Sequence, residues 1–433
     1  MYTLIGIAFI IGYVAIALEH NLKIDKAASA LFTAVICWLL VVIGKTTLFP
    51  GIPAEADHIL GERLLEHLGD ISGILFFLLG AMTIVELVDV HDGFSIITDK
   101  ITARKKSTLL IVLAVITFFM SAALDNLTTA IVMATLLRKI IHDKKDLFLF
   151  AGIIIIAANA GGAWSPIGDV TTIMLWIGGQ VSTTSIIGRL LLPSIVCLAV
   201  PLTIMAFRLK GKLSLAADSD SNQKHEVAIP VKEKKIVLGM GLGALLFVPI
   251  FKTITHLPPF MGILFGLSVF WATTELMNKR KEEETRESLS ISRVLQKVDT
   301  SSILFFLGIL LAVAALQTSG MLNNFAQFLD KSLGDVWLIN ILIGLLSSIV
   351  DNVPLVAGAM GMYDLSVYPQ DNIFWELLAY CAGTGGSCLI IGSAAGVAIM
   401  GILKIDFMWY LKNISLLAVV GYLSGVAVFW LMN

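Results

Sequence analysis

The chain has 433 residues, of which 57% are hydrophobic and 14% charged, and its formal net charge is −2. So few polar side chains could not cover the surface of a soluble domain of this length, whereas apolar segments long enough to cross a hydrocarbon layer of ~30 Å recur throughout. The composition therefore predicts an all-α polytopic membrane protein surrounded by a lipid bilayer, and it gives no indication of nucleic-acid binding.

Apolar runs bounded by polar or Gly/Pro-rich stretches predict the membrane helices. In chain order, the predicted segments are 2–19, 26–43, 73–90, 107–123, 127–141, 147–178, 186–208, 235–251, 258–277, 302–317, 335–350, 353–363, 372–403 and 407–432. The first is predicted to be a retained helix, because it lacks the basic n-region and cleavage site of a signal peptide. The long acidic loop 44–72 is predicted to carry a short amphipathic helix near ERLLEHL, at 62–68.

Two pairs of these segments indicate re-entrant hairpins, at 107–141 and 335–363. Arms of 11–17 residues rise at most ~25 Å at ~1.5 Å per residue, and each pair meets at an Asp-Asn dipeptide. Irregular backbone at membrane depth is tolerated where protein or a water-filled cavity surrounds it. Pairs that cross the membrane twice would fit the same pattern.

The basic residues predict an orientation. With the N-terminus outside and hairpin 107–141 entering from the cytoplasmic side, 25 of the 30 Lys and Arg residues fall on the inside. This is a strong positive-inside signal. It does not distinguish hairpins from pairs that cross fully, because both give the same parity.

Three sequence blocks recur in the same order. ILFFLLGAMTIVELV at 74 resembles ILFFLGILLAVAALQ at 303, SAALDNLTTA at 121 resembles SSIVDNVPLVA at 347, and AANAGGAWSPIGDV at 157 resembles CAGTGGSCLIIGSA at 381. Five predicted crossings separate the first blocks of the two copies, so the copies should face opposite ways. Inverted repeats with interrupted helices are typical of secondary transporters, whose sites lie near the bilayer midplane.

These features predict about 11 transmembrane helices in two inverted repeats, each with a re-entrant hairpin and a discontinuous helix. The predicted regions are N-terminal helices and an acidic outer loop at 1–72, a first repeat at 73–208 with its broken helix at 147–178, a cytoplasmic linker at 209–234, connecting helices and a cytoplasmic loop at 235–301, and a second repeat at 302–433 with its broken helix at 372–403.

The hairpin tips carry the first candidate site residues, Asp125 and Asn126 and their counterparts Asp351 and Asn352. An ionised carboxylate at the bilayer centre costs ~2.5–3.5 kcal/mol on insertion scales, so a matched pair indicates function. Hard cations bind carboxylate, amide, hydroxyl and backbone carbonyl oxygens, and the neighbouring hydroxyls belong to Thr128, Thr129, Ser347 and Ser348. Alternatively, each aspartate is only the N-cap of the following arm.

The broken segments carry the second group. Three glycines and a proline within NAGGAWSPIGD, at 159–169, predict an unwound stretch. Its polar candidates are Asn159, Ser165, Asp169, Thr171 and Thr172, and those of the second copy are Thr384, Ser387 and Ser393. Asp169 has no acidic counterpart, because Ser393 holds that place, so the site is expected to be asymmetric. Alternatively, the glycines serve close helix packing.

Glu86 is a further candidate for a proton path, or else a solvated acid near the inner surface.

The two tips, the break and the repeat together resemble NhaD-type sodium/proton antiporters. These belong to the ion-transporter superfamily, with arsenite permeases and divalent-anion/sodium symporters. The resemblance extends from segment 73–90 to about residue 403, and LDNLTT at 124–129 and IVDNVP at 349–354 are its most specific parts. In the symporters the tips carry Ser-Asn-Thr, which bind sodium beside an anionic substrate, whereas Asp replaces Ser at both tips here.

The resemblance implies an 11-helix, homodimeric protein of the bacterial inner membrane, with scaffold and transport regions. It points to these functional positions: Asp125, Asn126, Thr128, Asp169, Asp351 and Asn352.

We expect a secondary transporter that exchanges Na⁺, or Li⁺, for H⁺, with Na⁺ held by Asp125, Asn126, Asp351 and Asn352. A carboxylate in low dielectric has a raised pKa, and a nearby cation lowers it, so cation and proton compete for the same oxygens. The expected transported ions are Na⁺ or Li⁺ and H⁺. No cofactor and no catalytic residue are predicted.

Three alternatives stay open. A sodium-coupled organic-anion symporter would place a dianion beside several acids, with no intramembrane Lys or Arg to neutralise the charge of the dianion. An arsenite-type permease is compatible with the acids. An intramembrane aspartyl protease would need facing aspartates, but Pro166 occupies the first glycine position of the motif that PIGD, at 166–169, approximates. The four cysteines lie without CxxC spacing and indicate neither disulfides nor a zinc site.

Overall fold

The computed structural model describes residues 2–17, 19–48, 56–98, 105–211, 229–279, 281–349 and 351–433. Most of them are helical, and no β-strand forms within these ranges. By length and composition, nine helices in this part of the chain are able to cross a membrane, and shorter apolar helices accompany them. The chain is therefore an all-α polytopic membrane protein.

The N-terminal segments form three long helices, α1 (Tyr2–Ala17), α3 (Lys26–Ile43) and α5 (Ala56–Val90), and the short helices α2 (Glu19–Leu22), α4 (Lys45–Leu48) and α6 (Ser95–Thr98). The amphipathic helix predicted near 62–68 is present, but the loop predicted around it is wrong from Ala56 onward, because the helix runs without a break into the membrane segment. This stretch contains no proline, and Arg63 donates to Glu66 at 3.0 Å, an i,i+3 pair that supports a helix in water. Residues 49–55 lie outside the described ranges.

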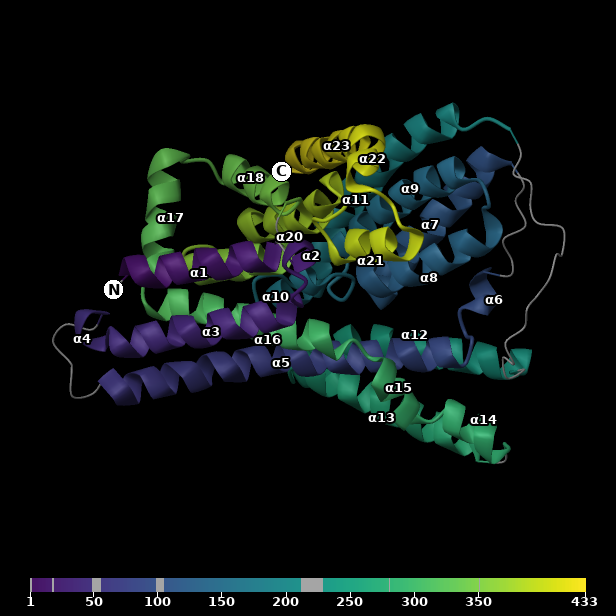
Figure 1. The fold of residues 1–433 in the computed structure, drawn as a ribbon, viewed down its shortest axis with the longest axis horizontal. Helices are drawn as coiled ribbons and strands as arrows, with labels where there is room; N and C mark the ends of the chain where they lie inside the picture. The colour runs from purple at the N-terminus through teal and green to yellow at the C-terminus, as the bar shows by residue number, and fades with distance from the viewer. Residues whose placement is uncertain are drawn as a thin grey trace.

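Each predicted hairpin forms as two short helices. The first consists of α7 (Lys106–Leu124) and α8 (Asn126–Ile140), and the second of α18 (Val336–Leu346) and α19 (Asn352–Met362). In Figure 1, α7 and α8 lie together in the right half of the molecule, whereas α18 lies in the left half. With 19 residues, α7 is also long enough to cross a membrane, so arm length alone does not establish a re-entrant hairpin.

Both predicted helix breaks are present. α9 (Lys144–Ala163) and α10 (Val170–Ile177) form the first broken helix, and α20 (Ile373–Gly385) and α21 (Ala394–Leu403) form the second, which has a 3₁₀ turn at Gly386–Cys388. Packing joins the two halves crosswise. α7 lies on α9 and α18 on α20, but α8 packs on α21 and α19 on α10. Each hairpin therefore touches the broken helix of both halves.

The remaining long helices are α11 (Thr183–Arg208), α12 (Val231–Thr255), α13 (Pro259–Asn278), α16 (Thr300–Thr318) and α23 (Leu416–Met432), the last continuing α22 (Phe407–Tyr410) through a π-helical turn at Leu411–Ser415. In the view of Figure 1, α3, α5, α12, α13 and α16 form a lower layer, and the broken helices and the first hairpin lie above it. α11 packs on α23, and α16 packs on α3 and α5.

Besides the short helices α2, α4 and α6, three more helices were not predicted. α14 (Glu283–Ser288) and α15 (Ile291–Lys297) lie in the loop 278–300, and α17 (Met321–Ser332) connects α16 to α18. α17 is amphipathic: Leu322 and Ala326 are buried, while Phe325 and Phe328 are exposed. Long apolar runs do not reveal such helices, because α17 has one polar face and α14 (EETRES) has no apolar residue at all. Most of the predicted linker 209–234 lies outside the described residues.

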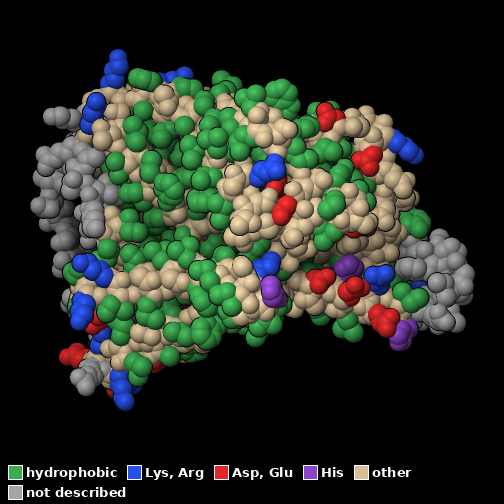
Figure 2. All heavy atoms as spheres, turned by 180° about the vertical axis from the view of Figure 1, so that it is seen from behind, with side chains coloured by type: hydrophobic (Ala, Val, Ile, Leu, Met, Phe, Trp, Pro, Cys, Tyr) green, Lys and Arg blue, Asp and Glu red, His purple; other side chains and the backbone are tan. Residues whose placement is uncertain are grey.

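The surface matches a bilayer environment. Figure 2 shows hydrophobic side chains spread over one face, with most of the visible lysine and arginine at its left end and a few in its middle and at its right end. Large exposed apolar side chains occur on many helices, among them Phe32, Phe76, Phe207 and Leu276. The four cysteines are buried and free.

Candidate functional site

The first hairpin tip is a strained turn around Asp125. This residue has φ 90° and ψ 160°, a region that costs roughly 1–3 kcal/mol for a residue with a side chain. Its Oδ1 accepts the backbone N–H of Thr128 at 2.7 Å, and its Oδ2 accepts the Thr128 hydroxyl at 2.9 Å. Asp125 is thus the N-cap of α8, as the alternative interpretation expected. The two hydrogen bonds leave further lone pairs on both oxygens.

The second tip has the same cap without the strain. Asp351 caps α19 by accepting the backbone N–H of Val353 on Oδ1 at 3.2 Å, and its φ is −50°. Asn352 follows it and is buried. Capping therefore explains part of what each tip aspartate does, but a neutral serine would cap at a lower desolvation cost.

Asp169 lies at the break between α9 and α10, and it is only 1% exposed. Its Oδ1 accepts both the backbone N–H and the hydroxyl of Thr171, at 2.8 and 2.7 Å, and the Thr172 hydroxyl donates to its backbone carbonyl at 2.8 Å. Its other oxygen accepts a hydrogen bond from the side-chain amide of Asn126. The first hairpin tip and the first break are therefore tied together through a carboxylate.

A chain of side-chain amides continues from this carboxylate into the other half of the molecule. Asn126 Nδ2 also donates to Asn159 Oδ1 at 3.1 Å. Asn159 Nδ2 in turn donates to the hydroxyls of Ser387 at 2.9 Å and Ser393 at 2.8 Å. Because Asn159 is fully buried, this network couples the two broken helices at their breaks.

Glycines allow the backbones to approach closely at these points. A methyl group on Gly161 would overlap the carbonyl oxygen of Phe118 in α7, and one on Gly385 would overlap that of Gly344 in α18. The glycines therefore do serve close helix packing. It also serves the site, since it holds each hairpin against the break beside it.

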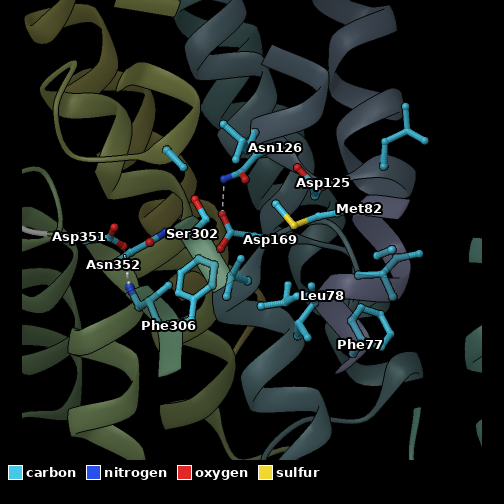
Figure 3. Close-up of a pocket in the computed structure, with 18 of the residues that line it drawn as sticks. Phe77, Leu78, Met82, Asp125, Asn126, Asp169, Ser302, Phe306, Asp351 and Asn352 are labelled. Atoms are coloured by element: carbon cyan, nitrogen blue, oxygen red, sulfur yellow. Dashed lines mark hydrogen bonds between the residues drawn. The ribbon is translucent and has the colours of Figure 1, made fainter. Parts of the chain in front are cut away.

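The tips and the first break line one small cavity (Figure 3). The centre of a water-sized sphere can occupy about 50 Å³ of it, room for a few waters. Polar groups come from Asp125, Asn126, Asp169, Asp351 and Asn352, and Figure 3 shows Asp169 in the middle, between Asp351 and Asn352 on its left and Asp125 on its right. The apolar wall includes Phe77, Leu78 and Met82 of α5 and Phe306 of α16. The tertiary structure thus brings together polar residues up to 227 positions apart in sequence, from Asp125 to Asn352.

A much larger cavity, about 940 Å³, adjoins the small one. Both are lined by Lys26, Met82, Leu127, Ser302 and Ala394. The larger cavity separates α8 and α21 from α5 and the start of α16, and it contains Thr128 and Glu86. The Glu86 carboxylate lies 3.3 Å from the Lys297 ammonium.

Lys26 corrects an expectation from the sequence. The acids were expected to have no basic partner, but the Lys26 ammonium lies 3.6 Å from Oδ2 of Asp351 and 4.5 Å from the centre of the Phe305 ring. Lys26 begins α3, and in Figure 1 the neighbouring α2 lies near the middle of the long axis. The sequence places this lysine in a short turn between two helices, and the side chains of such turns are normally solvated. Its contact with Asp351 depends on tertiary packing.

The secondary candidates lie at different places. The hydroxyls of Ser165 and Thr384 donate to the carbonyls of Ala122 and Tyr380, at 2.5 and 2.6 Å, and the buried Thr129 hydroxyl has no partner within the described residues. These three do not line the small cavity, whereas Ser302, which sequence reasoning missed, does. Nothing in the sequence around Ser302 indicates a site residue, because a serine in the first turn of a helix is common.

Among the described residues, no three His, Cys, Asp or Glu side chains converge closely enough to hold a metal ion. A cation in the small cavity would therefore take many of its ligands from amide, hydroxyl and backbone carbonyl oxygens, which suit a hard monovalent ion better than a transition metal.

Comparison with known proteins places this architecture in a family. A family model described as a citrate transporter matches residues 13–378. The chain is 31% identical to the Na⁺/H⁺ antiporter NhaD of Vibrio cholerae, over 98% of this chain and 90% of that protein. The chain belongs to the NhaD-type antiporter family. The resemblance drawn from the hairpin tips and the break is confirmed.

Plant relatives of this family match as well. The chain is 48% identical to sodium/proton antiporter 1 of Arabidopsis thaliana, over 98% of this chain and 71% of that protein. It is 46% identical to sodium/proton antiporter 2 of the same plant, over 97% of both chains. This NhaD-type chain is therefore a membrane transporter by family, and both plant and bacterial proteins are among its relatives.

Proposed function

We propose that this protein exchanges Na⁺ or Li⁺ for H⁺ by alternating access, through competition of cation and proton for Asp125, Asp169 and Asp351. The observation that carries the proposal is the convergence of these carboxylates, with Asn126 and Asn352, on one small cavity. The names of the relatives support the same exchange. Both ions need the same oxygens, and each carboxylate has lone pairs left after its capping hydrogen bonds.

The larger cavity supports a direction of access. It reaches the site along α8, α21 and the C-terminal part of α5, and in Figure 1 these elements share the right half of the molecule with α6. The positive-inside pattern assigns that end to the cytoplasm. On this proposal, ions enter the cavity from the cytoplasm through the large opening, while packed helices close the other end.

We also propose that residues 73–208 and 302–433 are inverted repeats. The crosswise packing of α8 on α21 and of α19 on α10 supports this, as do the matched caps at Asp125 and Asp351. The other parts of the proposal are an N-terminus outside, a location in the inner membrane if the source is bacterial, and a homodimer. Labelling of single cysteines introduced into loops from one side would test the orientation, and cross-linking in the native membrane would test the dimer.

Replacing Asp125 with asparagine tests the exchange. In everted vesicles that hold a respiration-generated pH gradient, sodium should collapse the gradient with the unaltered protein and choline should not. Asp125→Asn keeps an N-cap for α8 but removes the charge for which cation and proton compete, so sodium should no longer collapse the gradient. Full sodium-dependent proton movement by a folded Asp125→Asn protein would refute the mechanism.

One observation favours a second candidate, a sodium-coupled symporter of an organic anion. The matching family model is described as a citrate transporter, and Lys26 supplies a basic group that the sequence analysis did not foresee. Three carboxylates still line the cavity, against this single ammonium, so the site should repel a polycarboxylate. We expect vesicles to take up no labelled citrate or succinate above a sodium-free control; sodium-dependent uptake would favour the symporter. Resistance assays would detect arsenite transport.

A further inference from the structure

We propose that Lys26 is a tethered competitor of the transported cation. Its ammonium neutralises Asp351 when the second hairpin tip is empty, and an entering sodium ion displaces it. This inference rests on the proposed exchange function, and it assigns to a residue outside both repeats the setting of sodium affinity at the site.

The geometry of the pair suits displacement. At 3.6 Å, the Lys26 ammonium is an ion-pair partner of Asp351 Oδ2 but too distant for a normal hydrogen bond. The two side chains are 27% and 21% exposed, so water and ions reach them. A sodium ion that coordinates the carboxylate directly would therefore break no hydrogen bond to the lysine.

The surroundings give the displaced ammonium other favourable places. It lies 4.5 Å from the centre of the Phe305 ring, a cation–π arrangement that does not need the carboxylate. Lys26 also lines the larger cavity, together with the acids Glu19, Asp25 and Asp299. The lysine is thus free to release Asp351 without becoming an isolated charge in an apolar wall.

The pair also makes the two tips electrostatically different. Within the described residues, Asp351 is the one aspartate of the three with a basic side chain within 4.0 Å; Asp125 and Asp169 are held by hydroxyl, amide and backbone donors. The second tip therefore has no net charge while Lys26 is in place, and the first keeps its acids for the cation or proton. Sodium at the second tip must outcompete a cation that is always present at high local concentration.

Substituting Lys26 separates this role from a structural one. With the competitor removed, Lys26→Gln should lower the sodium concentration for half-maximal proton movement about tenfold. Lys26→Arg, which keeps the charge, should stay near the unaltered protein. A lysine that only braced the fold would give the opposite result, because its loss would weaken sodium binding. Should Lys26→Gln not purify as folded protein, Lys26→Met tests the same prediction.

Binding measured without transport makes the test decisive. We would follow thermal stabilisation of the purified protein by sodium chloride, with choline chloride at equal ionic strength as the control. The sodium concentration that gives half-maximal stabilisation, the midpoint, should fall about tenfold in Lys26→Gln. In an Asp351→Asn background, the same substitution should change this midpoint less than about twofold.

The outcomes distinguish the inference from the function on which it rests. An unaltered protein that neither binds sodium nor moves protons would overturn the proposed function. If the unaltered protein responds to sodium while Lys26→Gln has an equal or higher midpoint, the competitor role of Lys26 is overturned and the exchange function stands.

Discussion

Asp169→Asn is expected to lower sodium-dependent proton movement by more than about a hundredfold, since even residues beyond the direct ligands of a metal ion cost 10–100-fold when they are replaced. Asp169 is nearly fully buried, and Thr171 and Asn126 already use part of its hydrogen-bonding capacity. An asparagine there still caps α10. It offers no negative charge, however, and its amide nitrogen would face the donating amide of Asn126. The readout is the collapse of a pH gradient by sodium in everted vesicles.

Asp143→Asn is the matched control for this experiment. Asp143 is the N-cap of α9 in the same half of the chain and accepts the backbone N–H of Asp146 at 2.9 Å, but it is exposed. Since asparagine caps as well as aspartate, this variant should keep nearly full exchange. Comparable activity in the Asp169→Asn and Asp143→Asn proteins would exclude Asp169 from the ion pathway.

Gly385→Ala is expected to disrupt the second half of the site and to destabilise the fold. A methyl group at this position would overlap the carbonyl oxygen of Gly344, which belongs to the backbone of α18 and cannot rotate away. The second hairpin and α20 would have to separate, which should cost about 1–3 kcal/mol as in other overpacked interiors. It would also displace the Asp351 tip. Thermal unfolding of the purified protein and exchange in vesicles measure the two effects.

Gly358→Ala is the matched control, because Gly358 lies in α19 of the same hairpin with nothing near its hypothetical methyl group. Alanine favours a helix over glycine, so this variant should be as stable and active as the unaltered protein. Equal stability and activity of Gly385→Ala would show that the hairpin and the broken helix are not held in the close contact described above.

Local sequence was sufficient to predict the main parts of the candidate site. An Asp-Asn pair occurs twice inside an apolar run, within sequence blocks that recur in the same order, and it predicted both tips. The glycine and proline content of 159–169 predicted the break. These features stand out in the sequence because a carboxylate in hydrocarbon and several glycines in a helix are both energetically costly. The same reasoning found Asn159, Ser387 and Ser393, although not that they bond to one another.

The sequence predicted amphipathic helices less well, because they do not consist of long apolar runs. α5 begins at Ala56, whereas its amphipathic sequence predicted only a short helix near 62–68 within a loop, and α17 is half polar. Both are helices because of ordinary propensity, side-chain pairing and packing on neighbours. Apolar length alone therefore underestimated the helical part of the chain.

By itself, the sequence determined the class of protein, the places where helices break and the carboxylates that need a reason to be buried. Each of these follows from the cost of putting a given residue into a helix or a bilayer, which is a local quantity. Only the tertiary structure decided which groups meet: Asn126 with Asp169, Asn159 with the serines of the other half, and Lys26 with Asp351. A partner's identity depends on how distant helices pack, and the charge of a binding site depends on its partners.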